Sequence, residues 1–190
     1  DLAACGIEYT LVDDYHFWRA GFESEACEGY YISECGGETI KLFPISKALR
    51  YKLPFSPHQE AVEAIASMRT AVCFDDGEKF GLWPHTHEWV YGKGWLESFV
   101  SAVMGTHRIQ TTQFSTYIDL YPALGLAYLP NTSYYEMGNW SYGPKRSAMS
   151  EEAKNILTGH FGERYAQSLL GGGTWKNFLV KYPEANHIHK

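Results

Sequence analysis

Hydrophobic positions in the first half of the chain predict strands that alternate with a helix. Apolar, β-prone side chains fill most of residues 6–12 and 39–45, and a third such run begins at Thr70. Before that third run, residues 57–68 place apolar side chains on one helical face, and Ser56 is expected to cap this helix. A strand, a helix and a further strand in this order predict an α/β fold.

The remaining apolar runs predict one more core helix and two further strands. Residues 95–103 carry an apolar stripe at helical spacing, which is more typical of core packing than of a cofactor site. Residues 108–112 and 125–130 are strand candidates, while the glycines and acids of residues 23–37 predict a loop. We find no internal repeat and no low-complexity linker between these elements.

The pattern changes towards the C-terminus, where helices replace strands. We place a domain boundary near residue 148, between α/β material in residues 1–148 and a helical segment in residues 149–190. Ser150 is expected to cap the first of these helices, because two acids follow it at the positive end of the helix dipole. Gly159 is expected to end that helix.

Length and charge narrow the class of protein. The 190 residues suffice for one domain with a full core. The chain has 16 basic and 22 acidic residues, a formal charge of −6 and no cluster of Lys and Arg, so neither nucleic acid nor an anionic membrane is expected as a partner. No apolar run approaches the roughly 18 residues that indicate a membrane-spanning helix.

The cysteines and the aromatic residues add two further expectations. Cys5, Cys27, Cys35 and Cys73 form no CxxC pair, so reduced thiols in a cytoplasmic protein are the simplest interpretation and disulfides the alternative. Aromatic residues make up 16% of the chain, which favours a protein with stacking surfaces over a plain scaffold.

Acidic and aromatic residues gather where the third apolar run ends. Asp75, Asp76 and Glu78 follow that run at once, and Trp83 comes a few residues later. Carboxylates can bind sugar hydroxyls and an indole offers a flat apolar face, so the stretch predicts a sugar site at a strand end. Because adjacent residues of a strand point to opposite faces, at most one of the two aspartates is expected to face this site with Glu78. A solvated Asp-Asp-Gly-Glu turn is the alternative interpretation.

The same arrangement recurs after two other predicted strands. Asp14 and His16 follow the first strand, and Tyr135 and Glu136 follow the last. For His16, a turn histidine bonded to a nearby carboxylate is the alternative. Two further histidines follow Pro84, but no third ligand stands at a recognisable spacing, so we predict neither a metal site nor a cofactor.

Several long motifs of the chain are specific enough to compare with known families. They are Val12-Asp13-Asp14-Tyr15-His16-Phe17, Phe74-Asp75-Asp76-Gly77-Glu78-Lys79-Phe80-Gly81-Leu82-Trp83-Pro84, Thr86-His87-Glu88-Trp89-Val90-Tyr91, Tyr128-Leu129-Pro130, Ser133-Tyr134-Tyr135-Glu136-Met137, Trp175-Lys176-Asn177-Phe178 and Lys181-Tyr182-Pro183-Glu184-Ala185-Asn186. These motifs and their order closely resemble glycoside hydrolase family 57, and within it the branch of 4-α-glucanotransferases and α-amylases. The resemblance covers nearly the whole chain.

The resemblance implies an α/β fold in which residues 1–148 are the C-terminal part of a catalytic (β/α)7 TIM-like barrel, followed by the incomplete start of a helical region in residues 149–190. It also implies a retaining mechanism on α-1,4-glucan or maltooligosaccharides. Asp76, just before Gly-Glu-x-Phe-Gly, takes the position of the general acid/base, and Glu78 and Trp83 match positions that line sugar subsites. Further substrate-binding candidates, chosen because they follow predicted strands, are Asp14, His16, Tyr135 and Glu136.

The chain also departs from the pattern of the family. The family's nucleophile is a glutamate in a Trp-Leu-x-Glu-Arg type motif, which lies upstream of the position matched by Asp1, and a later Asn-Asp-Ala motif lies beyond Lys190. We therefore expect an internal piece of a longer protein, which holds one of the two catalytic carboxylates and is inactive alone.

Three hypotheses remain open from the sequence. The chain comes from an α-glucan-acting enzyme, from a glucan-binding or regulatory domain without a nucleophile, or from a metal-dependent barrel of the deacetylase type. The sequence does not decide between hydrolysis and transfer, the preferred chain length, or whether the protein forms homo-oligomers.

Overall fold

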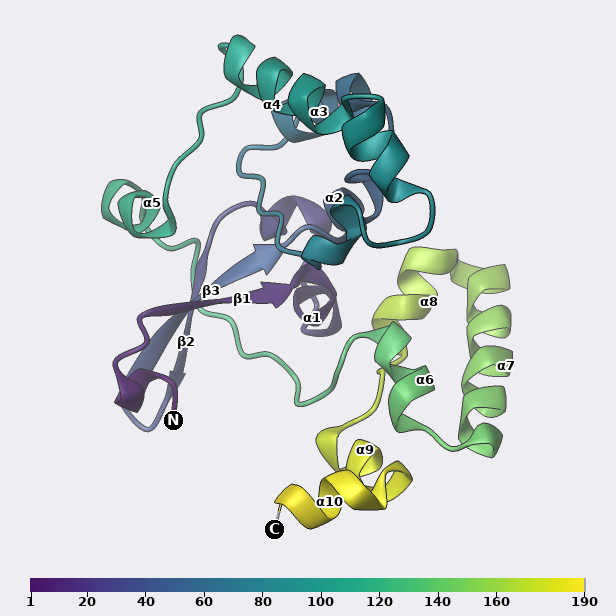
Figure 1. The fold of residues 1–190 in the computed structure, drawn as a ribbon. Helices are drawn as coiled ribbons and strands as arrows, with labels where there is room; N and C mark the ends of the chain where they lie inside the picture. Colours follow the sequence, from purple (N-terminus) through teal and green to yellow (C-terminus); the bar gives the residue numbers. More distant parts are fainter. Residues whose placement is uncertain (190) are drawn as a thin grey trace. The chain divides into compact units, whose positions relative to one another are not determined.

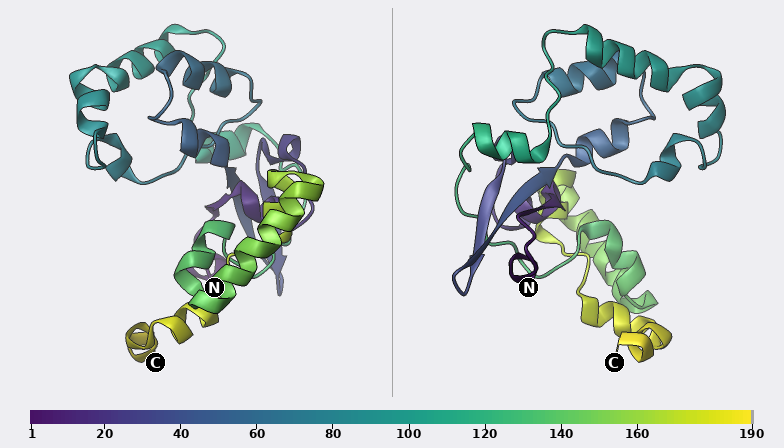
Figure 2. Two further views of the ribbon diagram at one scale, coloured as in Figure 1. Left: turned by 90° about the vertical axis from the view of Figure 1, so that its right-hand side faces the viewer. Right: turned by 60° about the vertical axis from the view of Figure 1, so that its left-hand side comes forward.

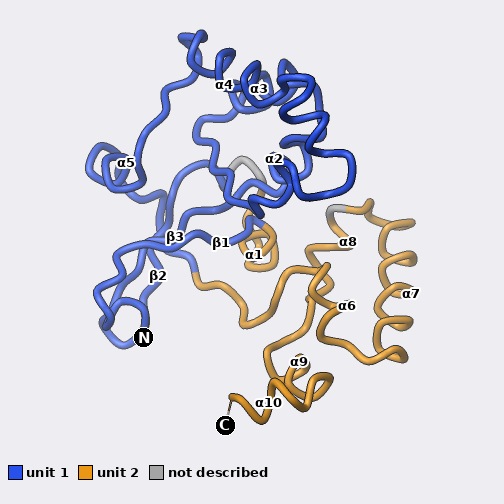
Figure 3. The backbone as a smooth tube through the Cα atoms, viewed as in Figure 1, with its two compact units in different colours: residues 1–14, 24–127 blue, residues 15–23, 128–190 orange. Residues whose placement is uncertain are grey.

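The computed structural model describes residues 1–189, apart from the side chains of residues 24, 25 and 164. It divides into two compact units, which Figure 3 shows in different colours. Unit 1 comprises residues 1–14 and 24–127, and unit 2 comprises residues 15–23 and 128–190. Both units are therefore discontinuous in sequence.

Unit 1 is built on a small mixed sheet. Its strands are β1 (Tyr9–Asp13), β2 (Tyr31–Cys35) and β3 (Glu38–Ile45), in the order β1-β3-β2 (Figure 1). Strand β3 runs parallel to β1 and antiparallel to β2. The strands predicted at residues 6–12 and 39–45 are confirmed by β1 and β3.

Strand β2 lies inside residues 23–37, where the sequence predicts a loop, so that prediction is wrong in part. Gly36 and Gly37 adopt φ angles of 64° and 86° and form the two-residue turn that joins β2 to β3. Glycine adopts this left-handed conformation without steric cost, and the conformation matches the twist of a tight hairpin. The two glycines therefore mark a hairpin turn and not an extended loop.

The third predicted strand, which begins at Thr70, is not a strand in the structure. The N–H of Ser46 donates to the Val72 carbonyl at 2.8 Å, and residues 71–76 form no ladder with the described strands. Val72 is nevertheless buried, because it packs in the hydrophobic cluster beside β3. The apolar pattern reflects side-chain burial here, and not strand pairing.

The two remaining strand predictions are also wrong. Residues 108–112 are irregular and mostly exposed, so they have no buried face to hold them against a sheet. Residues 125–130 contribute only a one-residue parallel bridge, between Leu126 and Ile32 of β2, within the described residues.

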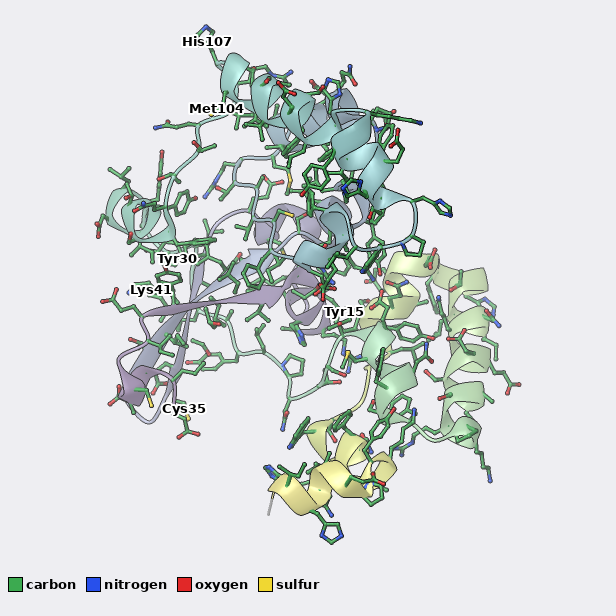
Figure 4. All side chains as sticks on the ribbon, viewed as in Figure 1. Tyr15, Tyr30, Cys35, Lys41, Met104 and His107 are labelled. Carbon is green, nitrogen blue, oxygen red and sulfur yellow. The ribbon has the colours of Figure 1, made fainter. Side chains whose placement is uncertain are left out.

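One buried cluster covers β3. Phe43 packs with Tyr30, which is labelled in Figure 4, and with Val72. Helix α5 (Phe114–Leu120) lies against this cluster, and the ring centroids of Phe114 and Phe43 are 4.8 Å apart. This packing fixes the carboxyl end of β3, where the chain enters the next helix.

Another buried cluster joins the remaining long helices of unit 1. These are α2 (Lys47–Lys52), α3 (His58–Ala66) and α4 (Trp95–Gly105). They bury Leu49, Ala61 and Trp95 together, and α3 lies beside α4 (Figure 2). The helices predicted at residues 57–68 and 95–103 are confirmed by α3 and α4.

The predicted cap of α3 is wrong. Pro57 holds the N-cap position, and no side chain caps the helix there. The Ser56 carbonyl instead accepts a hydrogen bond from Trp95 Nε1 at 2.7 Å. The serine that does act as a cap is Ser46, whose hydroxyl accepts the Leu49 N–H at the start of α2.

Unit 2 is helical within the residues that the structure describes. It holds most of α1 (Asp14–Arg19), together with α6 (Gly138–Ser141), α7 (Pro144–Phe161), α8 (Glu163–Leu169), α9 (Trp175–Lys181) and α10 (Pro183–His189). Helix α7 packs on α8, and α9 packs on α6 and α10. The buried Tyr15, which is labelled in Figure 4, donates its hydroxyl hydrogen to the Leu170 carbonyl, and this bond joins α1 to the segment after α8.

Helix α7 starts earlier and ends later than the sequence predicts. It begins at Pro144, which suits a first helical turn, so Ser150 lies inside the helix and does not cap it. Gly159 is also interior, and the helix ends before Gly162, whose φ of 83° is easy for glycine. The change near residue 148 therefore falls within α7, and the domain division at that position stays a prediction.

Shorter helical turns complete the described chain. They are η1 (Ala3–Cys5), η2 (Ser24–Cys27), η3 (Gly77–Phe80), η4 (Glu88–Gly92) and η5 (Tyr135–Met137). In residues 1–189, no helix has both the length and the apolar character that crossing a bilayer requires. No disulfide joins the cysteines that the structure describes.

Candidate functional site

The predicted sugar site lies on a turn of unit 1 that follows the extended residues 71–76. Asp76 immediately precedes η3, which holds Glu78. Asp76 and Glu78 are both exposed, whereas the Asp75 side chain is 7% exposed. The two adjacent aspartates therefore lie in different environments.

Basic side chains surround the Asp75 carboxylate. Lys79 Nζ donates to its Oδ2, and Arg50 Nε lies 3.5 Å from its Oδ1. The same Oδ1 accepts the backbone N–H of Asp76 at 2.9 Å. A carboxylate is costly to bury unless it is paired, so these contacts allow Asp75 to be buried and hold the peptide that carries Asp76.

Arg50 connects this turn to the sheet. Its Nη1 donates to Asp13 Oδ2 at 2.6 Å, and Asp13 is the last residue of β1. Arg50 itself lies in α2. A continuous row of charges therefore runs from the carboxyl end of β1, through α2, to Asp75 and Lys79.

Lys79 is 5% exposed and lies against a group of aromatic rings. Its Nζ donates to the Arg50 carbonyl at 2.8 Å. The same nitrogen lies 5.9, 5.8 and 5.6 Å from the ring centroids of Tyr51, Phe55 and Trp83, which we call the aromatic group. A cation over an aromatic face is attracted by the negative face of the ring, so Lys79 stabilises this group.

The Trp83 indole keeps part of its surface in solvent. It is 40% exposed, and the Phe55 ring stacks on it with centroids 5.9 Å apart and an interplanar angle of 23°. The backbone N–H of Trp83 donates to the Glu78 carbonyl at 3.1 Å, and the backbone carbonyl of Trp83 accepts the Thr86 hydroxyl at 2.7 Å. The indole is therefore held in place and retains an exposed surface on which a sugar ring can stack.

Gly81 allows the chain to turn between η3 and Trp83. Its φ is 146°, which other residues rarely adopt. A Cβ at this position would also come within 2.9 Å of the Tyr91 ring. Backbone conformation and space therefore both favour glycine in the Phe-Gly-x-Trp run.

Asp14 also belongs to unit 1, and its carboxylate takes part in the fold. It is 8% exposed, and its Oδ2 accepts the backbone N–H of Lys47, the first residue of α2, at 3.2 Å. His16 belongs to unit 2, where its ring lies edge-on to that of Tyr15 with centroids 6.0 Å apart. Substrate binding by either residue stays a prediction.

Tyr135 and Glu136 lie in η5 of unit 2. The Tyr135 hydroxyl donates to Glu151 at 2.8 Å, and Lys154 Nζ lies 5.1 Å from the ring centroid. Burial and the hydrogen bond to Glu151 raise the pKa of Tyr135 to about 12. Burial also raises the pKa of Tyr15, and the charge of Glu136 adds to this effect.

The seven predicted residues thus fall into two sets, each within its own unit. Unit 1 brings Asp76, Glu78 and Trp83 onto one turn and holds Asp14 directly after β1. Unit 2 holds His16, Tyr135 and Glu136.

Sequence reasoning gave no role to Arg50, Phe55 or Lys79, which shape this turn. The spacing of Asp75 and Lys79, four residues apart, was a usable signal, since such pairs meet on one face of a helical turn. Arg50 and Phe55 reach the turn from a distant part of the chain, and local pattern does not indicate that contact.

No group of three or more His, Cys, Asp and Glu side chains within the described part of the chain is arranged to hold a metal ion.

Comparison with known proteins places the chain in context. The family model described as "Glycosyl hydrolase family 57" matches residues 2–130. The 4-α-glucanotransferase of Thermococcus litoralis and the α-amylase of Pyrococcus furiosus are each 44% identical to the chain over 197 residues. "Alpha-amylase 1" of Dictyoglomus thermophilum is 39% identical. Each alignment covers 100% of this chain but only 29 or 30% of the relative, so the chain spans less than a third of the length of these proteins.

A solved structure gives the same result. The crystal structure of the 4-α-glucanotransferase from Thermococcus litoralis matches with a TM-score of 0.90 at 42% sequence identity. The match covers 99% of this chain and 30% of that one, and it shows an α/β fold of the same kind. Since the family model covers more than half of the residues, the chain belongs to glycosyl hydrolase family 57.

Proposed function

We propose that the full-length protein that contains this chain is a retaining glycoside hydrolase or transglycosylase that acts on α-1,4-glucan, as a 4-α-glucanotransferase or an α-amylase. The names of relatives that are 44% identical over the whole chain support this activity. We further propose that the sheet of unit 1 is part of a (β/α)7 barrel, with residues 1–148 as barrel and residues 149–190 as the start of a helical region.

The observation that carries the assignment of Asp76 is its contrast with Asp75. Asp75 is enclosed by Arg50 and Lys79, which leaves its carboxylate little access to a substrate. Asp76 is exposed at the start of the same turn that holds the partly exposed Trp83. Of the two aspartates, Asp76 is thus the one that can reach a glycosidic oxygen.

In the proposed reaction, Asp76 acts first as an acid and then as a base. A second carboxylate, supplied by a part of the protein outside this chain, attacks the anomeric carbon from about 5–5.5 Å away from Asp76. The bond between that carbon and the glycosidic oxygen breaks, and the oxygen takes the proton of Asp76. The hydroxyl of an acceptor then attacks the glycosyl-enzyme, its proton returns to Asp76, and the second carboxylate is released.

The acceptor decides between the two activities. Water as acceptor gives hydrolysis, and the 4-hydroxyl of a second glucan gives transfer. We propose that Trp83 stacks on a sugar ring and that Glu78 binds sugar hydroxyls on the same turn. Further substrate contacts are proposed for Asp14, His16, Tyr135 and Glu136.

The test replaces Asp76 by Asn in the full-length protein and follows maltotriose. Products are resolved by size, because hydrolysis yields only shorter sugars whereas transfer also yields longer ones. We expect Asp76→Asn to lower turnover at least about a hundredfold, the lower range for a lost general acid/base. Asp119→Asn, which changes an exposed aspartate of α5 in the same way, serves as the control. Near-normal turnover by folded Asp76→Asn protein would refute the assignment, and a wild-type protein that binds glucan without any turnover would indicate a non-catalytic domain.

A further inference from the structure

Lys79 lies between Asp76 and Trp83, two of the residues to which the proposed function gives direct roles. On one side its Nζ donates to Asp75, whose other carboxylate oxygen holds the backbone N–H of Asp76 at 2.9 Å. On the other side the same Nζ lies 5.6 Å from the ring centroid of Trp83. One buried ammonium group therefore contacts both the anchor of the proton donor and the sugar-stacking ring.

The surroundings of Lys79 are those of a fixed group and not of a solvated one. It is 5% exposed, and its Nζ also donates to the Arg50 carbonyl at 2.8 Å. Most lysines keep their ammonium group in water, because a buried charge is costly unless it is paired and hydrogen-bonded. The Lys79 ammonium group lies within the turn, where it is paired with Asp75.

We propose that Lys79 is a positioning residue, which sets the place of the Asp76 carboxyl relative to the sugar ring stacked on Trp83. The proposal rests on the proposed function, since it assigns Lys79 to the same site. Lys79 does not touch the substrate. It acts through Asp75, which fixes the Asp76 peptide, and through the aromatic group.

The positioning role predicts which substrates depend on Lys79. A proton donor that is displaced by a fraction of an ångström loses much of its effect, because proton transfer needs a hydrogen-bond distance of about 2.6–3.2 Å. The loss falls on substrates whose leaving group must be protonated. A 4-nitrophenyl group leaves as a stable phenolate and needs little help from an acid, so its cleavage does not depend strongly on where Asp76 lies.

The experiment compares two substrates in the full-length protein. The variants are Lys79→Met, which keeps an unbranched side chain of nearly the same length and removes its charge, and Lys93→Met, the control. Lys93 is exposed and its Nζ lies 6.0 Å from the Trp89 ring centroid, so the control also removes a lysine placed over an indole. For each variant, kcat/KM is measured on maltotriose and on 4-nitrophenyl α-maltoside.

We expect Lys79→Met to lower kcat/KM on maltotriose about a hundredfold and on the nitrophenyl substrate less than about tenfold. An equal loss on both substrates would mean that Lys79 only supports the fold or the stacking, and no loss on either would mean that it has no role. Both results overturn the proposal. If Lys79→Met does not fold, Asp75→Asn carries the same comparison, because it keeps the shape of the anchor and removes the charge that Lys79 binds.

Asp76→Asn, measured in parallel, separates this inference from the proposed function. If Asp76→Asn shows no dependence on the leaving group, the assignment of the acid fails and the positioning role fails with it. If Asp76→Asn shows that dependence and Lys79→Met does not, only the inference about Lys79 is wrong.

Discussion

Arg50 of α2 donates to the carboxylate of Asp13 at 2.6 Å, at the last residue of β1. The two residues are far apart in sequence, and the Asp13 side chain is 8% exposed. Because Arg50 also lies 3.5 Å from Asp75, the pair anchors the acid-bearing turn to the sheet. The stability of unit 1 should therefore depend on this arginine.

We expect Arg50→Met to lower the free energy of unfolding by about 3 kcal/mol, because it leaves the buried Asp13 without this partner. Urea denaturation followed by tryptophan fluorescence measures the change. Arg108→Met is the matched control. It removes an arginine that forms a bidentate pair with Glu63, with N–O distances of 2.7 and 3.0 Å, but both of these side chains are exposed. The control should change stability little, and equal effects of the two variants would contradict the anchoring role of Arg50.

Trp83→Ala should weaken the binding of maltooligosaccharides more than it slows the reaction. The indole is 40% exposed and held by the turn, so its loss removes a stacking surface without removing an acid. We expect KM to rise about tenfold, which corresponds to the upper range of aromatic stacking energies, with a smaller change in kcat. Leu82→Ala, at a side chain that is 81% exposed on the same turn, provides the comparison. An unchanged KM for Trp83→Ala would remove this residue from the substrate site.

Tyr135 should make stability depend on pH in the alkaline range. Its folded pKa, about 12, lies above the value of about 10 for an unfolded tyrosine. The folded state therefore holds the phenolic proton longer, so the contribution of Tyr135 is complete below about pH 10 and is lost as the pH rises towards about 12.

The variant Tyr135→Phe tests this dependence. At pH 7 it should be less stable by about 1 kcal/mol, because the hydrogen bond to Glu151 is lost. The difference in the free energy of unfolding between wild type and Tyr135→Phe should narrow between pH 10 and about 12, and denaturation curves recorded at each pH measure it. Tyr165→Phe, at an exposed position of α8, shows the effect of removing a hydroxyl from the surface. A gap that stays constant or widens would count against the raised pKa of Tyr135.

Gly172, the central residue of the run Gly171–Gly173 before α9, should tolerate no side chain. A Cβ on Gly172 would overlap the Tyr134 carbonyl, and the Gly172 N–H donates to the Ser133 carbonyl at 3.0 Å. We expect Gly172→Ala to cost about 2 kcal/mol or more, because backbone and not a flexible side chain stands in the way.

Gly159→Ala is the opposite case in the same unit. Gly159 lies inside α7, and a Cβ there would meet open space. Alanine should stabilise the helix by about 0.5–1 kcal/mol. Urea midpoints of the two variants should therefore lie on opposite sides of the wild-type value. A midpoint for Gly172→Ala at or above that of wild type would contradict the close packing at Gly172, and a lowered midpoint for Gly159→Ala would contradict the open space at Gly159.

Local pattern was enough to predict the elements whose apolar faces are regular. The strands β1 and β3 and the helices α3 and α4 follow from such faces. The hairpin at Gly36 and Gly37 was missed because its signal is a backbone conformation and not a periodicity. The strand expected after Thr70 was wrong because a buried side chain, Val72, was taken as a sign of strand pairing.

The candidate site could be located from the sequence but not resolved in detail. The motif around Asp76 indicates the turn and the family, and both comparisons support the family. Which of the adjacent aspartates is enclosed depends on Arg50, which approaches from α2. A contact of that kind arises from tertiary packing, and single-sequence pattern contains no trace of it.

Residues 15–23 belong to unit 2, although the residues on either side of them belong to unit 1. This division limits where the chain can be truncated. The family model ends at residue 130, close to the border of unit 1, which makes position 127 an inviting place to truncate. Such a truncation would discard Leu170 and Ser168, the acceptors of the Tyr15 hydroxyl and of the Arg19 side chain. A protein truncated at residue 127 would keep α1, with its aromatic side chains, and would lose the residues that accept hydrogen bonds from α1. To express unit 1, residues 15–23 must therefore be replaced by a designed linker, or the C-terminal helices must be retained.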